Sequence, residues 1–355
     1  MPVQFLTAQQ RASYGRYAQA PTPLELARYF HLDDADHQRI ADKRGSHHRL
    51  GFALQLTTVR YLGRFLEDGI QAPLSVVNTL TKQLGLLDGT CLADYHDQRG
   101  GERQRFRHME EICQAYGYRE ITAPLVGFRL ARWLYAQCWT GTDRPIVLFE
   151  RATTWLLAHK ILLPGASTLE RFIAKLRGRV EQRLWESLAQ SITPEQQQEL
   201  DALLEVPDGQ RRSGFDQLRS GPTQISGPSL VRAVERLARI RSQGISLPPT
   251  GSIPPSRIAG LAQFAARAKV TALHRLPTLR RMATLAAFLQ TLEAAAQDDV
   301  LAIVEALLQE IFGEAAKADQ KVRLRSLRDL DAAAGTLTAV CALLLDDEVS
   351  DAQVR

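Results

Sequence analysis

Four basic residues spaced four apart are the side chains of this sequence best suited to bind a polyanion. They are Arg171, Lys175, Arg179 and Arg183. Residues four apart share one face of an α-helix, and apolar residues recur on another face of the same segment: Leu169, Phe172, Ile173, Leu176, Val180 and Leu184. Because arginine and lysine bind phosphates and donate to guanine edges, this helix is a candidate for DNA contact.

The residues before this helix favour a helix-turn-helix. A helix expected to end near Lys160 is followed by Leu163-Pro164-Gly165, and Ser167-Thr168-Leu169-Glu170 has the form of a capping box. Two helices joined by a tight turn present the second helix to the major groove. The alternative is an ordinary surface helix whose bases are solvated and partly balanced by acids. Those acids are Glu170, Glu181 and Glu186.

Two further basic clusters are candidates for phosphate contact. The first lies beside Gly100 and Gly101 and contains Arg99, Arg103, Arg105, Arg107 and His108. We expect it to form a glycine-rich basic loop that binds phosphate. The alternative is a run of charged side chains that are only solvated. The second is predicted on a helix from Pro228, on the face opposite Leu230, Val234 and Leu237. It consists of Arg232, Arg236 and Arg239.

The distribution of charge indicates where a polyanion would bind. The net charge of +5 divides into +6 over 1–190, −4 over 191–205, +10 over 206–285 and −7 over 286–355. The 206–285 block has 13 basic and 3 acidic residues, so it cannot neutralise itself and we expect a polyanion partner. Most of the basic residues are arginine and few are lysine. Phosphate binding would favour arginine, and a high GC content of the gene is the alternative explanation.

No catalytic constellation is present in the sequence. It has no His-Glu-x-x-His zinc motif, no Gly-Lys pair for a phosphate-binding loop and no Gly-x-Ser-x-Gly. The last tyrosine is Tyr135, too early for a tyrosine recombinase. Asp346-Asp347-Glu348 is interpreted as a helix end rather than a two-metal site. We expect no catalytic residue, metal site, cofactor or small-molecule substrate in this chain.

Composition and periodicity predict an all-α, multi-domain, cytoplasmic protein. The chain has 355 residues, 45% of them apolar and 23% charged, and no apolar run long enough to span a membrane. Four separated cysteines predict reduced, mostly buried thiols. Apolar residues repeat at helical spacing in nearly every segment. Helices are expected at 23–30, 34–43, 47–66, 73–84, 104–116, 124–138, 144–160, 167–190, 194–205, 228–242, 255–269, 278–312 and 315–346, the last two forming a hairpin.

We divide the chain into four parts by composition and charge. Residues 1–190 form a helical DNA-binding region with a second boundary expected near 85–103. Residues 191–205 form an acidic hinge helix, and 206–285 a basic DNA-binding or linker region. Residues 286–355 form the acidic helical hairpin, which is expected to serve linkage or association.

Several strings in chain order resemble the N-terminal region of transposases from replicative bacterial transposons, the Tn-three family. The strings are Lys43-Arg44-Gly45, Arg49-Leu50-Gly51-Phe52-Ala53-Leu54-Gln55-Leu56, Arg60-Tyr61-Leu62-Gly63, Ala115-Tyr116-Gly117-Tyr118-Arg119, Arg132-Trp133-Leu134-Tyr135, Leu163-Pro164-Gly165, Thr168-Leu169-Glu170-Arg171, Gly221-Pro222 and Ser226-Gly227-Pro228. Within them Leu50, Phe52, Leu54 and Leu62 are expected in a helix core.

The resemblance implies double-stranded DNA as the partner, bound at the terminal inverted repeats of a transposon in replicative transposition. In that family a separate RNase-H-like domain holds divalent metal such as Mg on three acids. This chain has no counterpart of that domain, so no activity is expected from it alone. The resemblance also implies a bacterial cytoplasmic protein and a homodimer at full length. It places DNA contacts approximately on Arg44, Arg49, Arg171, Lys175 and the Arg232 face.

Two other functions are alternatives to DNA binding. The chain could be a helical dimerisation or regulatory protein, acting through 286–355 as a truncated transposase that competes with the full enzyme. The other rival, an autonomous nuclease, has little support because no acidic triad is found.

Overall fold

The computed structural model describes residues 5–66, 72–97, 101–190, 192–244 and 253–345. Within these ranges the regular elements are sixteen helices and an isolated bridge between Arg119 and Ile161. The all-α prediction is therefore confirmed. The chain divides into two compact units, Met1–Leu184 with Gly251–Gly260, and Trp185–Thr250 with Leu261–Arg355.

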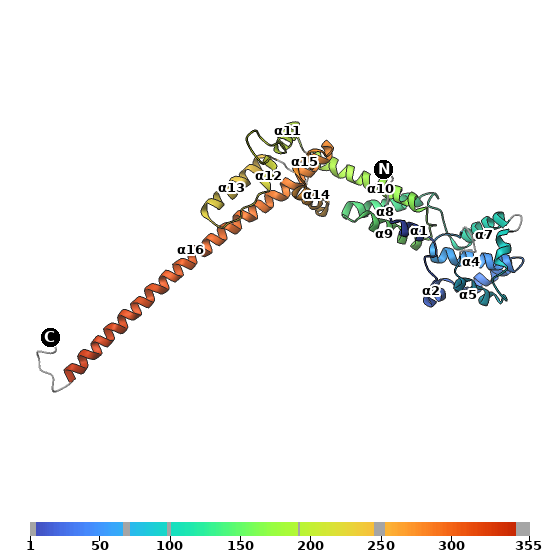
Figure 1. Ribbon diagram of the computed structural model, residues 1–355, viewed down its shortest axis with the longest axis horizontal. Coiled ribbons are helices and arrows are strands. Elements are labelled where there is room, and N and C mark those ends of the chain that lie inside the picture. Colours follow the sequence, from blue (N-terminus) through green and yellow to red (C-terminus); the bar gives the residue numbers. More distant parts are fainter. Residues whose placement is uncertain (1–4, 67–71, 98–100, 191, 245–252, 346–355) are drawn as a thin grey trace. The chain divides into compact units, whose positions relative to one another are not determined.

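Unit 1 has two hydrophobic cores, and the first encloses α4 (Ser46–Leu62). Every residue of α4 from Leu50 to Val59 is buried. Consecutive residues of a helix point in all directions, so α4 must be covered on every side. The covering helices are α2 (Pro23–Tyr29), α3 (Asp34–Ala41), α5 (Leu74–Leu84), α6 (Leu92–Asp97) and α7 (Gly101–Tyr116) (Figure 1). The expected core positions Leu50, Phe52 and Leu54 are buried, whereas Leu62 is half-buried.

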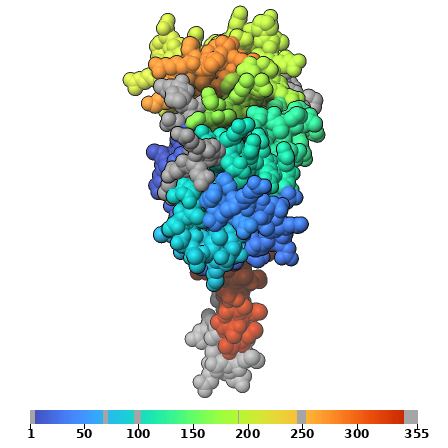
Figure 2. Space-filling view, turned by 90° about the vertical axis from the view of Figure 1, so that its right-hand side faces the viewer, coloured from blue at the N-terminus to red at the C-terminus, as the bar shows by residue number. Residues whose placement is uncertain are grey.

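The helices pack closely around α4, as the contacts of Gly51 and the surface of this part of the molecule show. A Cβ atom on Gly51 would lie 2.6 Å from the ring of Tyr95, so only glycine fits between α4 and α6. In the space-filling view the blue and cyan segments, which carry the helices of this core, adjoin as one continuous surface (Figure 2). The most recognisable string of the sequence therefore has a structural role.

A buried ion pair joins three helices of the first core. The guanidinium of Arg60 on α4 donates twice to the carboxylate of Asp36 on α3, with both distances 2.7 Å. The hydroxyl of Tyr116, at the end of α7, donates to the same carboxylate at 2.6 Å. Burial alone would raise the pKa of Asp36, but these bonds outweigh it and hold the pKa below its ordinary value.

The second core of unit 1 positions the predicted DNA-contacting helix. Its buried residues come from α8 (Val126–Thr140), α9 (Pro145–Ala158), α10 (Ala166–Ala189) and the connection between α9 and α10, which adds Ile161 and Leu163. Phe5 and Tyr14, which flank α1 (Ala8–Ser13), pack on this core. On α10 the buried stripe is Leu169, Ile173, Leu176, Val180 and Leu184. The predicted apolar stripe is confirmed, with Phe172 half-buried.

Unit 2 is built around the first half of one long helix. Its helices are α11 (Pro194–Leu203), α12 (Gly214–Arg219), α13 (Gly227–Ser242), α14 (Pro255–Arg267), α15 (Val270–His274) and α16 (Thr278–Leu345); α14 begins within unit 1. The core collects Phe215, Leu218, Ile240 and Leu273 against α16 between Met282 and Ala296. Figure 1 shows α13 lying along α16.

The expected helical hairpin at the C-terminal end is wrong. Helices were expected over 278–312 and 315–346, but α16 runs unbroken from Thr278 to Leu345. The predicted break lies at Gly313, but a glycine destabilises a helix interior only modestly. No proline or capping residue stands beside it, and alanine, glutamate and lysine follow. These residues favour the helical state, so the helix continues.

At two helix starts the sequence has threonine, then proline, and a glutamate or glutamine three residues after the threonine, a pattern that predicts a capping box. Thr22 and Thr193 each form a reciprocal capping box, with Glu25 and Gln196 respectively. The helices that the periodicity missed are α1, α6, α12 and α15, none longer than six residues. A segment of that length shows too few turns for a periodic pattern.

All four cysteines are free, but the expectation that they are mostly buried is only partly met. Cys138 is buried, Cys91 and Cys113 are half-buried and Cys341 is exposed. Across the ranges given above, no helix combines the length and the apolar character needed to cross a membrane. The acids 346–348 lie outside the described residues.

Candidate nucleic-acid interface

The solvent-facing side of α10 is a basic stripe opposite its buried stripe. Arg171, Lys175, Gly178 and Gln182 recur at intervals of four, three and four residues and are all exposed, as is Arg179 beside them. These five residues are called the outer face of α10. Since the buried stripe follows the same spacing from Leu169, the two sides are about half a turn apart. Packing thus fixes which side of α10 meets solvent.

The bases of the outer face have no acidic partner within the described part of the chain. The Nε atom of Arg171 donates to the backbone carbonyl of Ser167, at 3.2 Å, on its own helix. Glu181, also on α10, pairs with Arg177 at 3.6 Å. Glu170 is buried and pairs with Arg11. Glu170 and Glu181 therefore neutralise Arg11 and Arg177 and not the bases of the outer face, which remains positive.

Arg183 does not belong to this face, although it continues the four-residue spacing. Its guanidinium donates to the hydroxyl of Tyr135 at 2.9 Å and lies 5.2 Å from the centre of the Trp139 ring. Four-residue steps drift around a helix by about 40° each. Three such steps from Arg171 turn Arg183 toward α8, where it packs on aromatic rings.

The start of α10 is held by the N-terminal segment rather than by a capping box. The helix begins at Ala166, so Ser167 lies within it. The carboxylate of Glu170 accepts from the backbone amides of Phe5 and Leu6, at 2.7 and 3.1 Å. The predicted capping box is wrong because Glu170 reaches these distant amides instead of turning back on its own helix.

The connection from α9 to α10 is ordered by the segment before α8. It covers 159–165, longer than the roughly three- to four-residue turn of a compact helix-turn-helix. Lys160 has φ of 53°, the left-handed region. The amide of Arg119 donates to the carbonyl of Lys160 at 3.0 Å, and the amide of Leu162 returns a bond to Arg119 at 2.9 Å. The expected tight turn is therefore replaced by a longer, hydrogen-bonded connection.

A hollow of about 440 Å³ lies at the N-terminal end of α10. Arg11, Arg16 and Arg64 line it together with Ser167. The amino end of a helix favours anions, and Arg16 and Arg64 beside it reinforce that preference, whereas Arg11 is paired with Glu170. Sequence reasoning missed these three bases because they come from separate segments and no periodic pattern connects them.

The bases of the first core have mixed roles. Arg44 is exposed. Arg49 donates from Nε to the carbonyl of Lys43 at 3.1 Å and from Nη2 to that of Ala41 at 3.3 Å. These carbonyls lie at and just after the end of α3, so Arg49 satisfies acceptors that the helix leaves open.

The helix expected at 104–116 is confirmed, but it starts earlier, so the expected glycine-rich basic loop is wrong over 101–103. Gly101 is the first residue of α7, and Arg103, Arg105 and Arg107 lie on that helix. Arg103 and Arg107 are exposed, whereas the Arg105 guanidinium lies 5.7 Å from the Phe106 ring centre. The helix forms because His108 and Ile112, four residues apart, are buried in the first core. Residues 98–100, with Arg99 and Gly100, lie outside the described residues.

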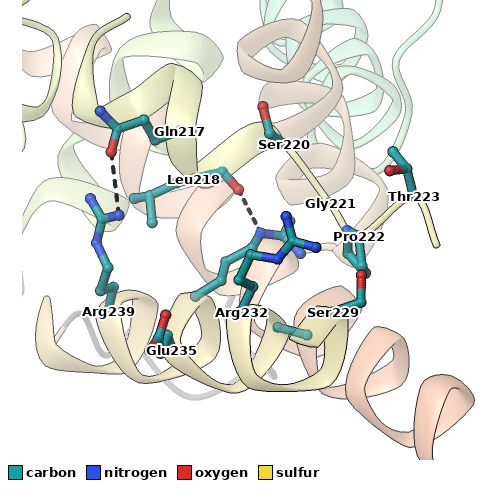
Figure 3. A pocket seen from close by; sticks show the side chains of 12 residues that line it. Gln217, Leu218, Ser220, Gly221, Pro222, Thr223, Ser229, Arg232, Glu235 and Arg239 are labelled. Carbon is teal, nitrogen blue, oxygen red and sulfur yellow. Dashed lines mark hydrogen bonds between the residues drawn. The ribbon is translucent and has the colours of Figure 1, made fainter. Parts of the chain in front are cut away.

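The third basic cluster lines a pocket between α12 and α13. Figure 3 shows Arg232 and Arg239 on α13 facing Gln217 and the segment from Ser220 to Thr223. The cavity measures about 340 Å³. Arg239 donates to the side-chain oxygen of Gln217 at 3.3 Å, and Arg232 to the carbonyl of Pro228 at 3.2 Å. Neither has an ion pair among residues that the structure describes.

Arg236 lies in the same pocket but is committed to the fold. Its Nε donates to the carbonyl of Leu218 at 2.8 Å, and its Nη1 to the carboxylate of Asp299 on α16 at 2.9 Å. The predicted face of α13 is therefore partly wrong, because Arg236 points toward α16. Val234, expected on the packed side, is 48% exposed.

The 206–285 block is also less unbalanced than its own composition indicates. Acids outside the block pair with three of its arginines. These pairs are Arg236 with Asp299, Arg241 with Glu293 and Arg281 with Asp201. The acidic hinge and α16 supply these partners, so counting charge within a sequence window overstates the positive charge available to a ligand.

His108 of the first core is a packed residue. His108 is 1% exposed, its Nδ1 lies 3.0 Å from the Tyr95 hydroxyl and its Nε2 lies 3.1 Å from the Gln104 amide. Burial, with smaller contributions from Lys43 and His48, lowers the pKa of His108 to about 4. In the described ranges no three His, Cys, Asp or Glu side chains are placed to hold a metal ion.

Comparison with known proteins finds relatives along the whole chain. A model described as a domain of unknown function, DUF4158, matches residues 5–176. The transposase for transposon gamma-delta of Escherichia coli (strain K12) is 42% identical over 355 residues, which is 100% of this chain and 35% of the relative. The transposase for transposon Tn1546 of Enterococcus faecium is 24% identical over 308 residues, 86% of this chain and 31% of that relative.

A third relative, the transposase for transposon Tn3926 of Escherichia coli, is 24% identical over 299 residues, 84% of this chain and 29% of the relative. The chain thus spans about a third of the length of the curated relatives it matches.

Proposed function

The chain is homologous to the N-terminal part of transposases of the Tn-three family, and from this homology and the outer face of α10 we propose that it binds double-stranded DNA at the terminal inverted repeats of a transposon. Its role in transposition is then recognition of the ends. Strand cutting and joining are assigned to no residue of this chain.

The observation that carries the proposal is the exposed, unneutralised outer face of α10. Arg171, Lys175 and Arg179 project from a helix whose other side is fixed in a core. A rigid helix with bases on its free side can enter the major groove and contact base edges and phosphates. Arg16 and Arg64, at the N-terminal end of α10, extend the same positive surface.

The α12–α13 pocket enters the proposal as a contact to backbone phosphates. Arg232 and Arg239 are seven residues apart, about 10 Å along the helix axis, and Ser220 and Thr223 line the same pocket. Phosphate contacts position a protein on DNA but carry little sequence information. We therefore assign sequence reading to α10 and a non-specific share of the affinity to this pocket.

Fluorescence anisotropy with a labelled inverted-repeat duplex from the element that encodes the chain tests the proposal. We expect tight binding that a scrambled duplex does not match and that weakens steeply with salt. Arg171→Ala with Lys175→Ala should weaken specific binding roughly 30- to 25,000-fold, since each of the two base contacts contributes about 1–3 kcal/mol. The helical circular-dichroism signal should not change, because both side chains are exposed.

A matched control is available on α16. Lys317 and Lys321 are also exposed and four residues apart on a helix. Changing both to alanine removes the same charge, and we expect binding within twofold of wild type. If the α10 double variant bound the inverted repeat as tightly as this control, the proposal would be wrong.

A second candidate function, association through α16, is favoured by a separate observation. Leu308, Ile311 and Phe312 are 48%, 61% and 70% exposed on this helix. Large apolar side chains gathered on one exposed side are typical of an interaction surface. We propose that this part of α16 mediates association between copies of the chain.

A further inference from the structure

The outer face of α10 has a glycine near its middle, and the fold gives no reason for one. Gly178 lies in the interior of a 24-residue helix. A Cβ atom built there would meet no heavy atom within 4 Å apart from the adjacent residues and the backbone of its own helix. Gly51 differs, because Tyr95 leaves no space for a Cβ there. Since glycine is the least favourable residue in a helix interior after proline, packing within this chain does not account for Gly178.

The surroundings of Gly178 indicate a negatively charged ligand. Arg171, Lys175 and Gln182 share its stripe and Arg179 is adjacent in sequence. Glu181 borders the stripe, but it pairs with Arg177 at 3.6 Å. The stripe carries no large apolar side chain, which a protein or lipid surface would need. Charge complementarity therefore favours DNA over another polypeptide as the occupant of the open space.

The dimensions of a helix and of the major groove explain what an absent side chain would provide. A helix with its side chains is about 10–12 Å across, and the major groove is about 12 Å wide. A side chain that points at the groove floor holds the helix axis away from the bases, whereas a glycine lets it approach. From Arg171 to Gln182 the stripe covers about 16 Å, the length of roughly five base pairs.

We infer that α10 lies in the major groove with Gly178 toward its floor, so that this glycine sets the distance between the helix and the bases. Lys175 lies about one turn before it and Gln182 about one turn after it, and both reach base edges from this position. The inference rests on the proposed function and adds a positioning residue that has no charge and donates no hydrogen bond from its side chain.

Two substitutions test the inference because stability and binding should change in opposite directions. Gly178→Ala and Gly178→Leu both improve helix propensity, so each should raise the thermal midpoint by about 2–4 °C. Both should weaken binding to the inverted-repeat duplex, about threefold for alanine and at least twentyfold for leucine. Binding to a scrambled duplex should stay within twofold, because the phosphate contacts remain.

Gly313 provides the matched control. It is another helical glycine, on α16, and a Cβ atom added to it would likewise meet no heavy atom within 4 Å apart from the adjacent residues and the backbone of its own helix. Gly313→Ala and Gly313→Leu should give a similar gain in thermal midpoint and leave DNA binding within twofold of wild type. A selective loss at position 178 supports the groove geometry, since general stiffening of a helix would affect both positions alike.

The failure of this inference can be distinguished from failure of the proposed function. If Gly178→Leu bound the inverted repeat within twofold of wild type while the Arg171 and Lys175 double variant lost binding, the groove geometry would be overturned and DNA recognition by α10 would stand. If the double variant also bound like wild type, both would be overturned. A Gly178→Leu loss equal on inverted-repeat and scrambled duplexes would also overturn the groove geometry.

Discussion

The guanidinium of Arg11 lies 2.6 Å from the carboxylate of Glu170, and this pair fastens the N-terminal segment to the start of α10. The side chain of Glu170 is 1% exposed. Arg11 also donates to the hydroxyl of Ser167 at 2.8 Å. Residues more than 150 positions apart in sequence thus fix the end of α10 that presents the outer face.

The pair makes the stability of unit 1 depend on pH. Burial alone would raise the pKa of Glu170, but the amides of Phe5 and Leu6 and the Arg11 guanidinium outweigh it and hold the pKa below its ordinary value. Because the pKa of Glu170 is lower in the folded than in the unfolded protein, its ionised carboxylate stabilises the fold at pH values above the unfolded-state pKa, near 4.3. This stabilisation is lost as the pH falls through the folded-state pKa.

Glu170→Gln should therefore destabilise the protein by about 2 kcal/mol at pH 7, the range for hydrogen bonds to a charged group. The difference from wild type should shrink below about pH 4.3. Urea unfolding followed by circular dichroism between pH 3 and 7 measures it. A difference that stayed constant over this range would show that the carboxylate charge is not the stabilising feature.

Where the controlling interactions are local, the sequence was a sufficient guide. The two sides of α10 could be predicted because Leu169, Ile173 and Leu176 alternate with Arg171 and Lys175 within a few turns. The capping boxes at Thr22 and Thr193 were equally readable, since both partners lie three residues apart.

Where the partner is distant in sequence, the prediction failed. On α13 both Leu230–Val234–Leu237 and Ala233–Arg236–Ile240 have helical spacing. The choice between these faces depends on Asp299, 63 positions away, which pairs with Arg236. The capping role predicted for Glu170 failed for the same reason. Its hydrogen-bond partners lie in the N-terminal segment, more than 150 residues away.

The buried pair between Asp36 and Arg60 gives a second stability prediction. Asp36→Asn leaves the Arg60 guanidinium without its charged partner in the interior, and we expect a loss of about 3–4 kcal/mol. Urea unfolding by circular dichroism, with hydrogen exchange of the α4 amides, locates the effect in the first core. Asp34→Asn, at an exposed position of the same helix, should change stability by less than about 0.5 kcal/mol. Equal effects of the two substitutions would contradict the role assigned to Asp36.

The α12–α13 pocket predicts a difference between phosphate contacts and base contacts. Arg232→Ala with Arg239→Ala should reduce the slope of log K against log salt by about 1.8, since each phosphate contact contributes about 0.9. Inverted-repeat and scrambled duplexes should weaken by the same factor. Anisotropy titrations at three or more salt concentrations measure both quantities.

Arg236→Ala serves as the contrasting variant in the same pocket. It should leave Asp299 without its partner and lower stability by about 2 kcal/mol, because Asp299 and the Leu218 carbonyl both lose a charged donor.

An unchanged salt slope in the Arg232 and Arg239 variant, or a loss confined to the inverted repeat, would show that these residues are not phosphate contacts.

The exposed apolar residues of α16 predict association that depends on concentration. Replacing Ile311 by Glu and Phe312 by Lys keeps the net charge and removes apolar surface from two residues that are 61% and 70% exposed. Because burial of such side chains stabilises an interface by about 1.5–3 kcal/mol each, the variant should be monomeric at protein concentrations where wild type associates. Light scattering coupled to size exclusion measures the mass.

Gln309→Glu with Gln320→Lys introduces the same two charges at exposed polar positions of α16 and should associate like wild type. The helical signal should be equal in all three proteins, since none of the four positions is buried. A wild-type chain that stayed monomeric at about 100 µM, well above a roughly micromolar dissociation constant, would contradict association through α16. So would an Ile311 and Phe312 variant that associated as strongly as the control. In either case the exposed side of α16 would need an occupant other than a second copy of this chain.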